Sequence, residues 1–191
     1  MDPNNKISDL ELFQKIKESD PAALKILFER YFNPLCYFSF QICKSTELSE
    51  ETVSDVFAEL WIKRSRINIQ TSFKSYLYTS VKNRSINYYK QEKRISEQKE
   101  LNQLHLITSE IQTDQTVNQK DLEKRIEELL NQLPEKRGLI FRMNRIDGLS
   151  YQEIADILSI SIHTVQNQMI KAVKFMAEQL PRIKKLFSIL F

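Results

Sequence analysis

The stretch "LSYQEIADILSISIHTVQNQMIKAVKFM", residues 149–176, contains two short apolar repeats that stop and restart within four residues. Ser150 and Glu153 have the spacing of a capping box, which predicts that a helix begins at residue 150. Ser161 is a second N-cap candidate, so another helix is expected to begin there. Two helices separated by so short a break can cross steeply and share one core. The pattern therefore predicts a helix-turn-helix, whose second helix can lie in a DNA major groove.

The apolar spacing gives the second helix an inner and an outer face. The positions expected to be buried are Ile162, Val165, Met169, Ala172 and Met176. The positions expected to face outward are His163, Thr164, Gln166, Asn167, Ile170, Lys171 and Lys174. Asn and Gln can bond adenine edges through both amide atoms, Thr can touch a thymine methyl group, and Lys can reach guanine or phosphate. A polar outer face is also normal for any surface helix, but short amides and hydroxyls in place of the usual Glu and Lys favour base reading.

The rest of the chain is also helical in character. Only two of the 191 residues are glycine, which argues against hairpins and Gly-rich phosphate loops. Leu, Ile, Lys, Glu and Gln recur at helical spacing, so we predict an all-α protein. Helix starts are expected at Ser8, at Asp20-Pro21 with a bend near Pro34, at Ser49 and at Ser72. Residues 93–119 are rich in Gln, Asn, Glu, Ser and Thr, which predicts a flexible linker between two small helical domains.

The charges are unevenly distributed along the chain. Residues 63–94 carry nine basic side chains and one acidic side chain, whereas residues 1–62 carry six basic and eleven acidic ones. Tyrosines are interleaved with the basic block, and rings that alternate with cations suit a nucleic-acid strand with unstacked bases. Asn83 and Asn87 share a helix face and could bond the edge of an extruded base. The alternative is that the tyrosines belong to the core and the lysines only solvate the helix.

Several other classes of function are disfavoured by the sequence. Cys36 and Cys43 are expected to be buried structural residues, because a metal site would need more ligands and both histidines, His105 and His163, are remote in sequence. We therefore expect no metal and no cofactor. A Ser/His/acid constellation is also lacking, so we expect that the protein is not an enzyme. Without a leader sequence or an apolar run of membrane-spanning length, the expected location is cytoplasmic.

Four segments occur in the order found in one protein family. They are "LFERYFNPLCYFSF", "ETVSDVFAELW", "SFKSYLYTSVKNRSINYY" and "LSYQEIADILSISIHTVQNQMIKA". From residue 10 to residue 180 the chain resembles the extracytoplasmic-function (ECF) sigma factors, which are small members of the sigma-70 family of bacterial transcription initiation factors. The resemblance implies a sigma domain 2 at residues 10–92, a linker at 93–119 and a sigma domain 4 at 120–180, followed by an apolar tail at 181–191.

The resemblance also implies a function and the residues that perform it. The protein would bind core RNA polymerase, direct it to promoters by reading the −35 and −10 elements, and help to melt the −10 region. Contacts with the −35 element would come from Tyr151, His163, Thr164, Gln166, Asn167, Lys171 and Lys174. Contacts with the −10 element would come from Arg66, Lys74, Lys82, Asn83, Asn87, Tyr88 and Lys90. Core polymerase would bind at Asp55, expected to be an exposed charge, and at Phe57, Leu60 and Trp61.

The chain departs from the family pattern at three positions. Ser159 stands in the turn where the family often has glycine, and Gln166 and Gln168 stand where it often has arginine or lysine. With fewer cations, binding to the −35 element is expected to depend more on amide contacts. An anti-sigma factor is a further expected partner, and no stable membrane insertion is expected.

Two other functions are consistent with parts of the sequence. A stand-alone helix-turn-helix transcriptional regulator would also need the motif at 149–176, but it would not need the basic and aromatic helix. A helical adaptor could use the terminal "KKLFSILF" as a docking or membrane-surface segment, although that segment is too short to span a bilayer.

Overall fold

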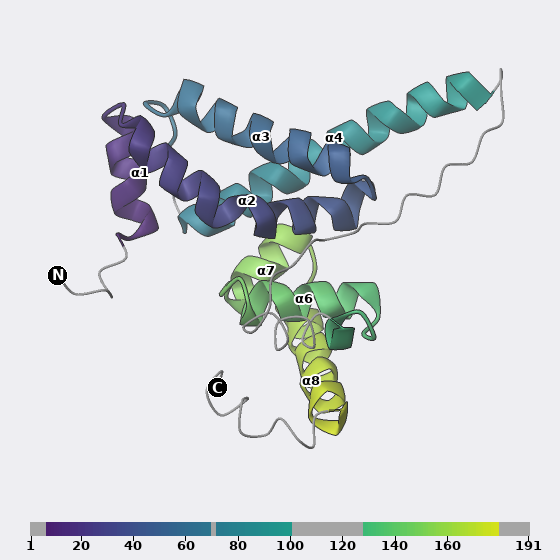
Figure 1. Cartoon of the computed structure of the whole chain (residues 1–191). Coiled ribbons are helices and arrows are strands. Elements are labelled where there is room, and N and C mark those ends of the chain that lie inside the picture. The colour runs from purple at the N-terminus through teal and green to yellow at the C-terminus, as the bar shows by residue number, and fades with distance from the viewer. Residues whose placement is uncertain (1–6, 70–71, 101–127, 180–191) are drawn as a thin grey trace, which may run out of the picture. The chain divides into compact units, whose positions relative to one another are not determined.

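The computed structural model describes residues 7–69, 72–100 and 128–179, with only the backbone described at residues 92 and 94–100. All regular structure within these ranges is helical (Figure 1). The chain divides into two compact units, and the division falls between residues 110 and 111. The predicted all-α class is therefore confirmed. No described helix has both the length and the apolar character needed to cross a membrane.

The first unit contains four helices: α1 (Asp9–Lys17), α2 (Pro21–Cys43), α3 (Thr46–Lys63) and α4 (Phe73–Glu100). The capping box predicted at Ser8 is present, because its hydroxyl accepts from the Glu11 amide while the Glu11 carboxylate accepts from the Ser8 amide. The Asp20 carboxylate caps α2, with Pro21 at the first helical position. The helix α2 continues through Pro34 as one element.

The start of α3 differs from the prediction. Ser45, not Ser49, is the N-cap, and its hydroxyl oxygen accepts from the Leu48 amide at 3.2 Å. Ser49 is buried inside the helix, and its hydroxyl donates to the Ser45 carbonyl at 2.6 Å. Lys44 ends α2 in a left-handed conformation with φ of 56°, which reverses the chain at once and lets the next helix begin a turn earlier. The predicted cap at Ser49 was therefore wrong by one helical turn.

Ser72 caps α4 as predicted, because its hydroxyl accepts from the Ser75 amide at 3.1 Å. Phe73, Leu77 and Val81 all face the core and are at most 2% exposed. The helix continues to Glu100 and projects beyond the other helices of its unit (Figure 1). It therefore extends into the stretch 93–119 that was predicted as a linker. The remainder of that stretch and the tail at 181–191 lie outside the described residues.

The core of the first unit forms around α2, which packs against α1, α3 and α4. Apolar side chains from each helix are fully buried there, among them Leu12, Leu27, Leu35, Leu60 and Leu77. The rings of Phe38 and Tyr78 meet with their centroids 5.1 Å apart where α2 crosses α4. The buried hydroxyls of Ser39 and Ser85 bond each other at 2.8 Å at the same crossing. These contacts fix the crossing of α4 with α2, and α4 also packs against α3.

The second unit contains α6 (Glu135–Arg145), α7 (Tyr151–Leu158) and α8 (Ile162–Gln179). The capping box of Ser150 and Glu153 begins α7 as predicted. Ser159 ends α7 with φ of 55°, and the Ser161 hydroxyl accepts from the Thr164 amide at 3.1 Å to begin α8. The break between the two helices is thus a turn with a cap on each side, which is the predicted helix-turn-helix.

Four of the five apolar positions predicted to lie inside α8 are buried: Val165, Met169, Ala172 and Met176. Ile162 is the exception, because 41% of its surface is exposed. It occupies the first position of the helix, where a side chain points back toward the N-terminus and beyond the packed turns. The prediction that Ile162 is buried was therefore wrong.

Candidate nucleic-acid interface

The outer face of α8 carries the polar side chains that the sequence placed there. His163, Thr164, Asn167, Lys171 and Lys174 are exposed, and Gln166 is half-buried. Ile170 adds an apolar group that is 67% exposed. The buried residues of α8 pack against α6 and α7, so this polar face is turned away from the core of its unit.

Within the described part of the chain, some of these side chains are hydrogen-bonded to a neighbouring residue, and others are not. His163 Nδ1 lies 3.0 Å from the Gln166 carbonyl oxygen, Oε1. The hydroxyls of Ser161 and Thr164 bond each other at 2.8 Å. The Asn167 amide has no bonding partner among the described residues, so both of its polar atoms are available to a ligand.

Gln168 and Tyr151 belong to the same unit but do not lie on the outer face of α8. Gln168 is turned toward α6, where Arg137 Nε donates to its carbonyl oxygen at 3.1 Å. Its amide therefore ties α8 to α6. Tyr151, predicted to contact the −35 element, is the first residue of α7 and is half-buried.

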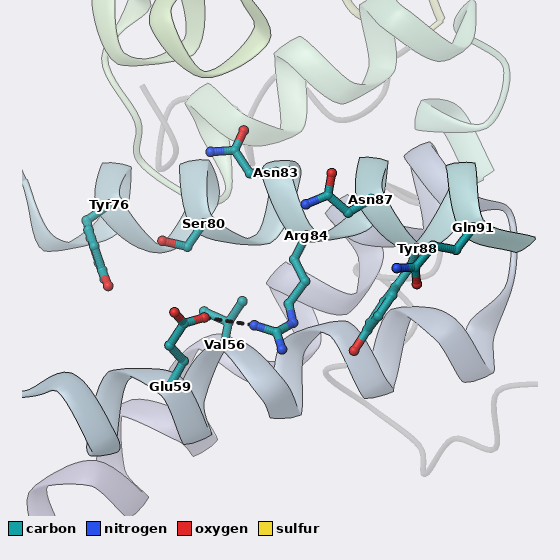
Figure 2. Close-up of a pocket in the computed structure, with 9 residues that line it drawn as sticks. All are labelled: Val56, Glu59, Tyr76, Ser80, Asn83, Arg84, Asn87, Tyr88 and Gln91. Atoms are coloured by element: carbon teal, nitrogen blue, oxygen red, sulfur yellow. Dashed lines mark hydrogen bonds and ion pairs between the residues drawn. The ribbon is translucent and has the colours of Figure 1, made fainter.

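In the first unit, a groove of about 390 Å³ lies between α3 and α4 (Figure 2). Its lining residues are Val56, Glu59, Tyr76, Ser80, Asn83, Arg84, Asn87, Tyr88 and Gln91. Asn83 and Asn87 project from the side of α4 that faces away from α3, at the rim of the groove, while Arg84 reaches across it (Figure 2). The structure therefore brings together three residues predicted for the −10 element, namely Asn83, Asn87 and Tyr88.

The other predicted −10 residues do not line this groove. Arg66 and Lys90 are exposed, and Lys74 and Lys82 are half-buried. Arg66 lies in the turn after α3, and the three lysines lie on α4. The structure therefore does not gather these four cations at the groove, and their proposed role in contacting phosphates stays a prediction.

Arg84 was not identified from the sequence, although it is central to the groove. Its Nη1 donates to Glu59 Oε2 at 2.8 Å and its Nη2 donates to Asp55 Oδ2 at 3.0 Å. The Tyr88 hydroxyl also donates to Asp55 Oδ2. The spacing of Asp55 and Glu59, one turn apart on α3, is a signal that could have indicated a cation opposite. These bonds tie α3 to α4 along the groove.

Hydrogen bonds and charges at the groove shift the pKa values of Glu59 and Tyr88. A hydrogen bond from Lys63, reinforced by the charges of Lys63 and Arg84, lowers the pKa of Glu59. The hydrogen bond that Tyr88 donates to Asp55 raises the pKa of the Tyr88 phenol, and partial burial adds to this. At neutral pH Glu59 is therefore a carboxylate paired with the Lys63 ammonium and the Arg84 guanidinium, and Tyr88 is a neutral phenol. Because these charges are paired with one another, the groove is more favourable to a neutral base than to a phosphate group.

Comparisons with known proteins agree with this arrangement. The family model described as "Sigma-70 region 2" matches residues 27–95, which include the groove. The model described as "Sigma-70, region 4" matches residues 123–176, which include the helix-turn-helix. Together the two ranges cover more than half of the chain. The chain belongs to the sigma-70 family.

Its relatives place this sigma factor in the extracytoplasmic-function group. It is 22% identical to the ECF RNA polymerase sigma-E factor of Haemophilus influenzae over 179 residues, which cover 87% of this chain and 92% of the relative. It is 19% identical to the ECF RNA polymerase sigma factor SigW of Bacillus subtilis over 175 residues, which cover 87% and 94%.

Two solved structures share the fold of this sigma factor. CnrH, determined in complex with the cytosolic domain of CnrY, aligns with a TM-score of 0.53 at 17% identity, covering 90% of this chain and 96% of CnrH. RpoE of Bartonella quintana, determined in complex with the anti-sigma factor NepR, aligns with a TM-score of 0.54 at 17% identity, covering 83% and 96%.

The four residues predicted to contact core polymerase differ in how far they are exposed in this sigma factor. Phe57 and Leu60 are 3% and 0% exposed, so they are part of the core of the first unit. Asp55, expected to be an exposed charge, is half-buried, and Arg84 and Tyr88 both bond it. Trp61 is half-buried, and the Arg64 guanidinium lies over its ring at 4.4 Å.

The outward side of α3 is formed by other residues. Ser54, Ala58 and Ile62 recur at helical spacing and are all exposed, and Ile62 is 73% exposed. Sequence reasoning missed Ile62 because it assigned the apolar part of the polymerase contact to Phe57, Leu60 and Trp61. The spacing of Ser54, Ala58 and Ile62, which places the isoleucine on a different face from Phe57 and Leu60, was the available signal.

The two cysteines of the sigma factor have structural surroundings. Cys43 is buried, and its sulfur lies 3.3 Å from the Ser49 hydroxyl. Cys36 is half-buried, and burial raises the pKa of its thiol to about 12. Cys36 therefore remains a thiol at neutral pH.

Proposed function

We propose that this sigma factor binds core RNA polymerase, directs it to particular promoters by reading the −35 and −10 elements, and helps to melt the −10 region. The observation that carries this proposal is the presence of both family regions, in order, in one chain. A stand-alone helix-turn-helix regulator would account for the second unit but not for the match to region 2. The family consists of transcription factors, so the proposal contains no catalytic step and no cofactor.

We assign the two roles to two domains, namely sigma domain 2 at residues 10–92 and sigma domain 4 at residues 120–180, joined by residues 93–119. The ranges matched by the family models support these assignments. The extension of α4 to Glu100 moves the end of the regular structure of the first domain several residues beyond residue 92.

For the −35 element, the reading surface is the outer face of α8. Asn167 has an amide that can use both polar atoms on an adenine edge. Lys171 and Lys174 are exposed cations on later turns of α8, where they suit phosphate contacts. Thr164 and His163 lie in the first turn of the helix, which is the part of a recognition helix that contacts base edges.

For the −10 element, the reading surface is the rim of the groove on α4. Asn83 and Asn87 supply amide donors and acceptors for an unpaired base, and the ring of Tyr88 offers a surface on which a base can stack. Arg66, Lys74, Lys82 and Lys90, which lie outside the groove, are the cations proposed for the strand's phosphates. The paired charges within the groove favour entry of a base over entry of the backbone.

For core polymerase, the proposed contact is the outward side of α3 with its neighbour Trp61. Ile62 is exposed, and Trp61, its neighbour in the chain, is half-buried. Large apolar groups of this kind serve as interface anchors. Phe57 and Leu60 act indirectly, because their burial holds α3 in place.

An anti-sigma factor is a further proposed partner. Two structural neighbours, CnrH and RpoE, were determined with the cytosolic domain of CnrY and with the anti-sigma factor NepR, respectively. We also infer that the protein acts in the cytoplasm, because bacterial core polymerase and promoter DNA are there.

The assignment to the −10 element can be tested by measuring promoter melting. The fluorescence of 2-aminopurine within the −10 element reports strand opening by the assembled holoenzyme. Asn83→Ala and Asn87→Ala should each reduce the opened fraction, because each removes an amide that would hold an unpaired base. The matched control is Asn33→Ala, an exposed asparagine on α2 outside the groove, which should open the promoter normally. Equal effects of all three variants would contradict the assignment.

A further inference from the structure

The starting observation is the bond between His163 and Gln166 on the outer face of α8. The two residues are three positions apart, so they lie on neighbouring turns of the same face. The distance from His163 Nδ1 to Gln166 Oε1 is 3.0 Å, which is within the range of a normal hydrogen bond. An amide oxygen can only accept, so Nδ1 must carry the hydrogen and donate it.

This bond limits what Gln166 can present to DNA. A glutamine reads adenine by using both amide atoms at once, since its oxygen accepts from N6 and its nitrogen donates to N7. In this structure the oxygen is held toward His163, on the side of the preceding turn. The NH2 group is then the part of the amide left for a base. Donors alone can engage both acceptors of guanine, O6 and N7, whereas adenine offers them only N7 beside its own N6 donor.

We propose that His163 is a positioning residue that determines the base preference of Gln166. By holding the carbonyl oxygen, it makes Gln166 a donor-only reader that favours guanine over adenine at the base it faces in the major groove. This inference rests on the proposed function of α8 in reading the −35 element. It differs from the simpler prediction that His163 is itself the DNA contact, because the effect acts through the Gln166 amide.

The neighbouring residues provide an internal comparison. Asn167 has an amide of the same chemistry but no bonding partner among the described residues, so it keeps the adenine preference expected of a free amide. Thr164 is paired with Ser161, and Gln168 is held by Arg137 on the other side of α8. Within the described part of the chain, His163 is thus the side chain that orients Gln166.

The experiment measures base preference with holoenzyme assembled from core polymerase and the full chain. A promoter library with a randomised −35 segment and a fixed −10 element is selected for bound and transcribed sequences. The base position that Gln166 faces is identified as the one whose preference disappears in Gln166→Ala. Three other variants are then compared at that position: His163→Ala, His163→Asn and Lys171→Ala.

His163→Ala frees the Gln166 oxygen, so the ratio of adenine to guanine at that position should rise about tenfold, which corresponds to one regained bidentate contact. His163→Asn should keep the wild-type preference, because Asn Nδ2 can occupy the place of His Nδ1 and donate in the same way. Lys171→Ala is the control and should weaken binding to all sequences without changing the preference. Preferences at the other randomised positions, including the one facing Asn167, should stay as in the wild type.

Two results would overturn the inference. An unchanged preference in His163→Ala would show that the bond does not direct Gln166. A preference lost equally in His163→Ala and His163→Asn would show that His163 contacts the base directly through Nε2. If wild-type holoenzyme selects no −35 sequence at all, the proposed function fails, and the inference fails with it. Circular dichroism melting of each variant separates these results from loss of folding, which is not expected at an exposed position.

Discussion

Thr52 is fully buried in the first unit, and its hydroxyl oxygen has no hydrogen-bond partner among the described residues. A buried hydroxyl without a partner costs on the order of 1–3 kcal/mol relative to an apolar group of the same shape. Thr52→Val should therefore raise the free energy of unfolding by about 1 kcal/mol, measured by urea denaturation. Thr46→Val, at the exposed first position of the same helix, is the control and should give no such gain. A loss of stability in Thr52→Val would contradict the absence of a partner.

Glu59 gives a second test at the scale of a single residue, because its ionisation makes the stability of the fold depend on pH. Its pKa is lowered from the ordinary value of 4.5, chiefly by the hydrogen bond from Lys63, so the unfolded chain binds its proton more tightly than the folded chain does. The resulting stabilisation is present above about pH 4.5 and is lost as the pH falls through the lowered folded-state pKa. Because Glu59 is 42% exposed, we expect only a few tenths of a kcal/mol to about 1 kcal/mol.

Thermal unfolding of Glu59→Gln at pH 6 and at about pH 3 measures this contribution. The variant should be less stable than the wild type at pH 6 and nearly equal to it at the lower pH. Glu51→Gln, an exposed change on the same helix, should differ little from the wild type at either pH. A deficit in Glu59→Gln that persists at low pH would mean that the ion pairs with Lys63 and Arg84 are not its cause.

At the scale of elements, the turn between α7 and α8 contains a left-handed residue that is not glycine. Ser159 has φ of 55°, a conformation that costs a residue with a Cβ atom about 1 kcal/mol. Ser159→Gly should therefore stabilise the second unit by up to about 1 kcal/mol and raise its melting temperature by several degrees. Ser150→Ala, which removes the capping box of α7, should lower stability by about 1 kcal/mol in the same assay. Destabilisation by Ser159→Gly would show that the serine side chain contributes more than the strain costs.

The elements also show how far sequence reasoning extends. The caps at Ser8, Asp20, Ser150 and Ser161 were predictable, because a cap and its partner lie within a few residues of each other. The cap of α3 was misplaced because Ser45 and Ser49 both fit the local pattern, and the choice between them depends on where α2 ends. A local pattern therefore predicts that a helix forms, but it does not predict which of two nearby caps begins that helix.

In the candidate sites, too, some residue positions follow from one segment of sequence and others depend on how two helices align. The outward face of α8 follows from its apolar spacing, so His163, Asn167 and Lys171 were placed correctly on the surface. The bonds from Arg84 to Asp55 and Glu59 depend on how α3 aligns with α4, which no single segment determines. For the same reason, Phe57 and Leu60 could not be assigned from one helix alone to a surface or to the core.

At the scale of the whole molecule, the two-unit organisation predicts independent stability. Thr52→Val lies in the first unit and Ser159→Gly in the second, so they share no contacts within either core. Distant substitutions without shared partners add to within about 0.5 kcal/mol. In calorimetry of the full chain, each substitution should therefore shift a different transition, and the double variant should show both shifts. A single transition displaced by either change would instead indicate that the units unfold together.

The central claim is that this chain gives core RNA polymerase its choice of promoter. The most direct measurement is run-off transcription from a library of host chromosomal fragments, with purified core polymerase in the presence and in the absence of the chain. We predict discrete transcripts that require both components, and weak binding of duplex promoter DNA by the chain alone. Ile62→Arg should reduce these transcripts while leaving thermal unfolding unchanged, because Ile62 is 73% exposed and outside the core. Tight and specific duplex binding by the isolated chain, with no transcripts that depend on it, would contradict the claim and favour a stand-alone regulator.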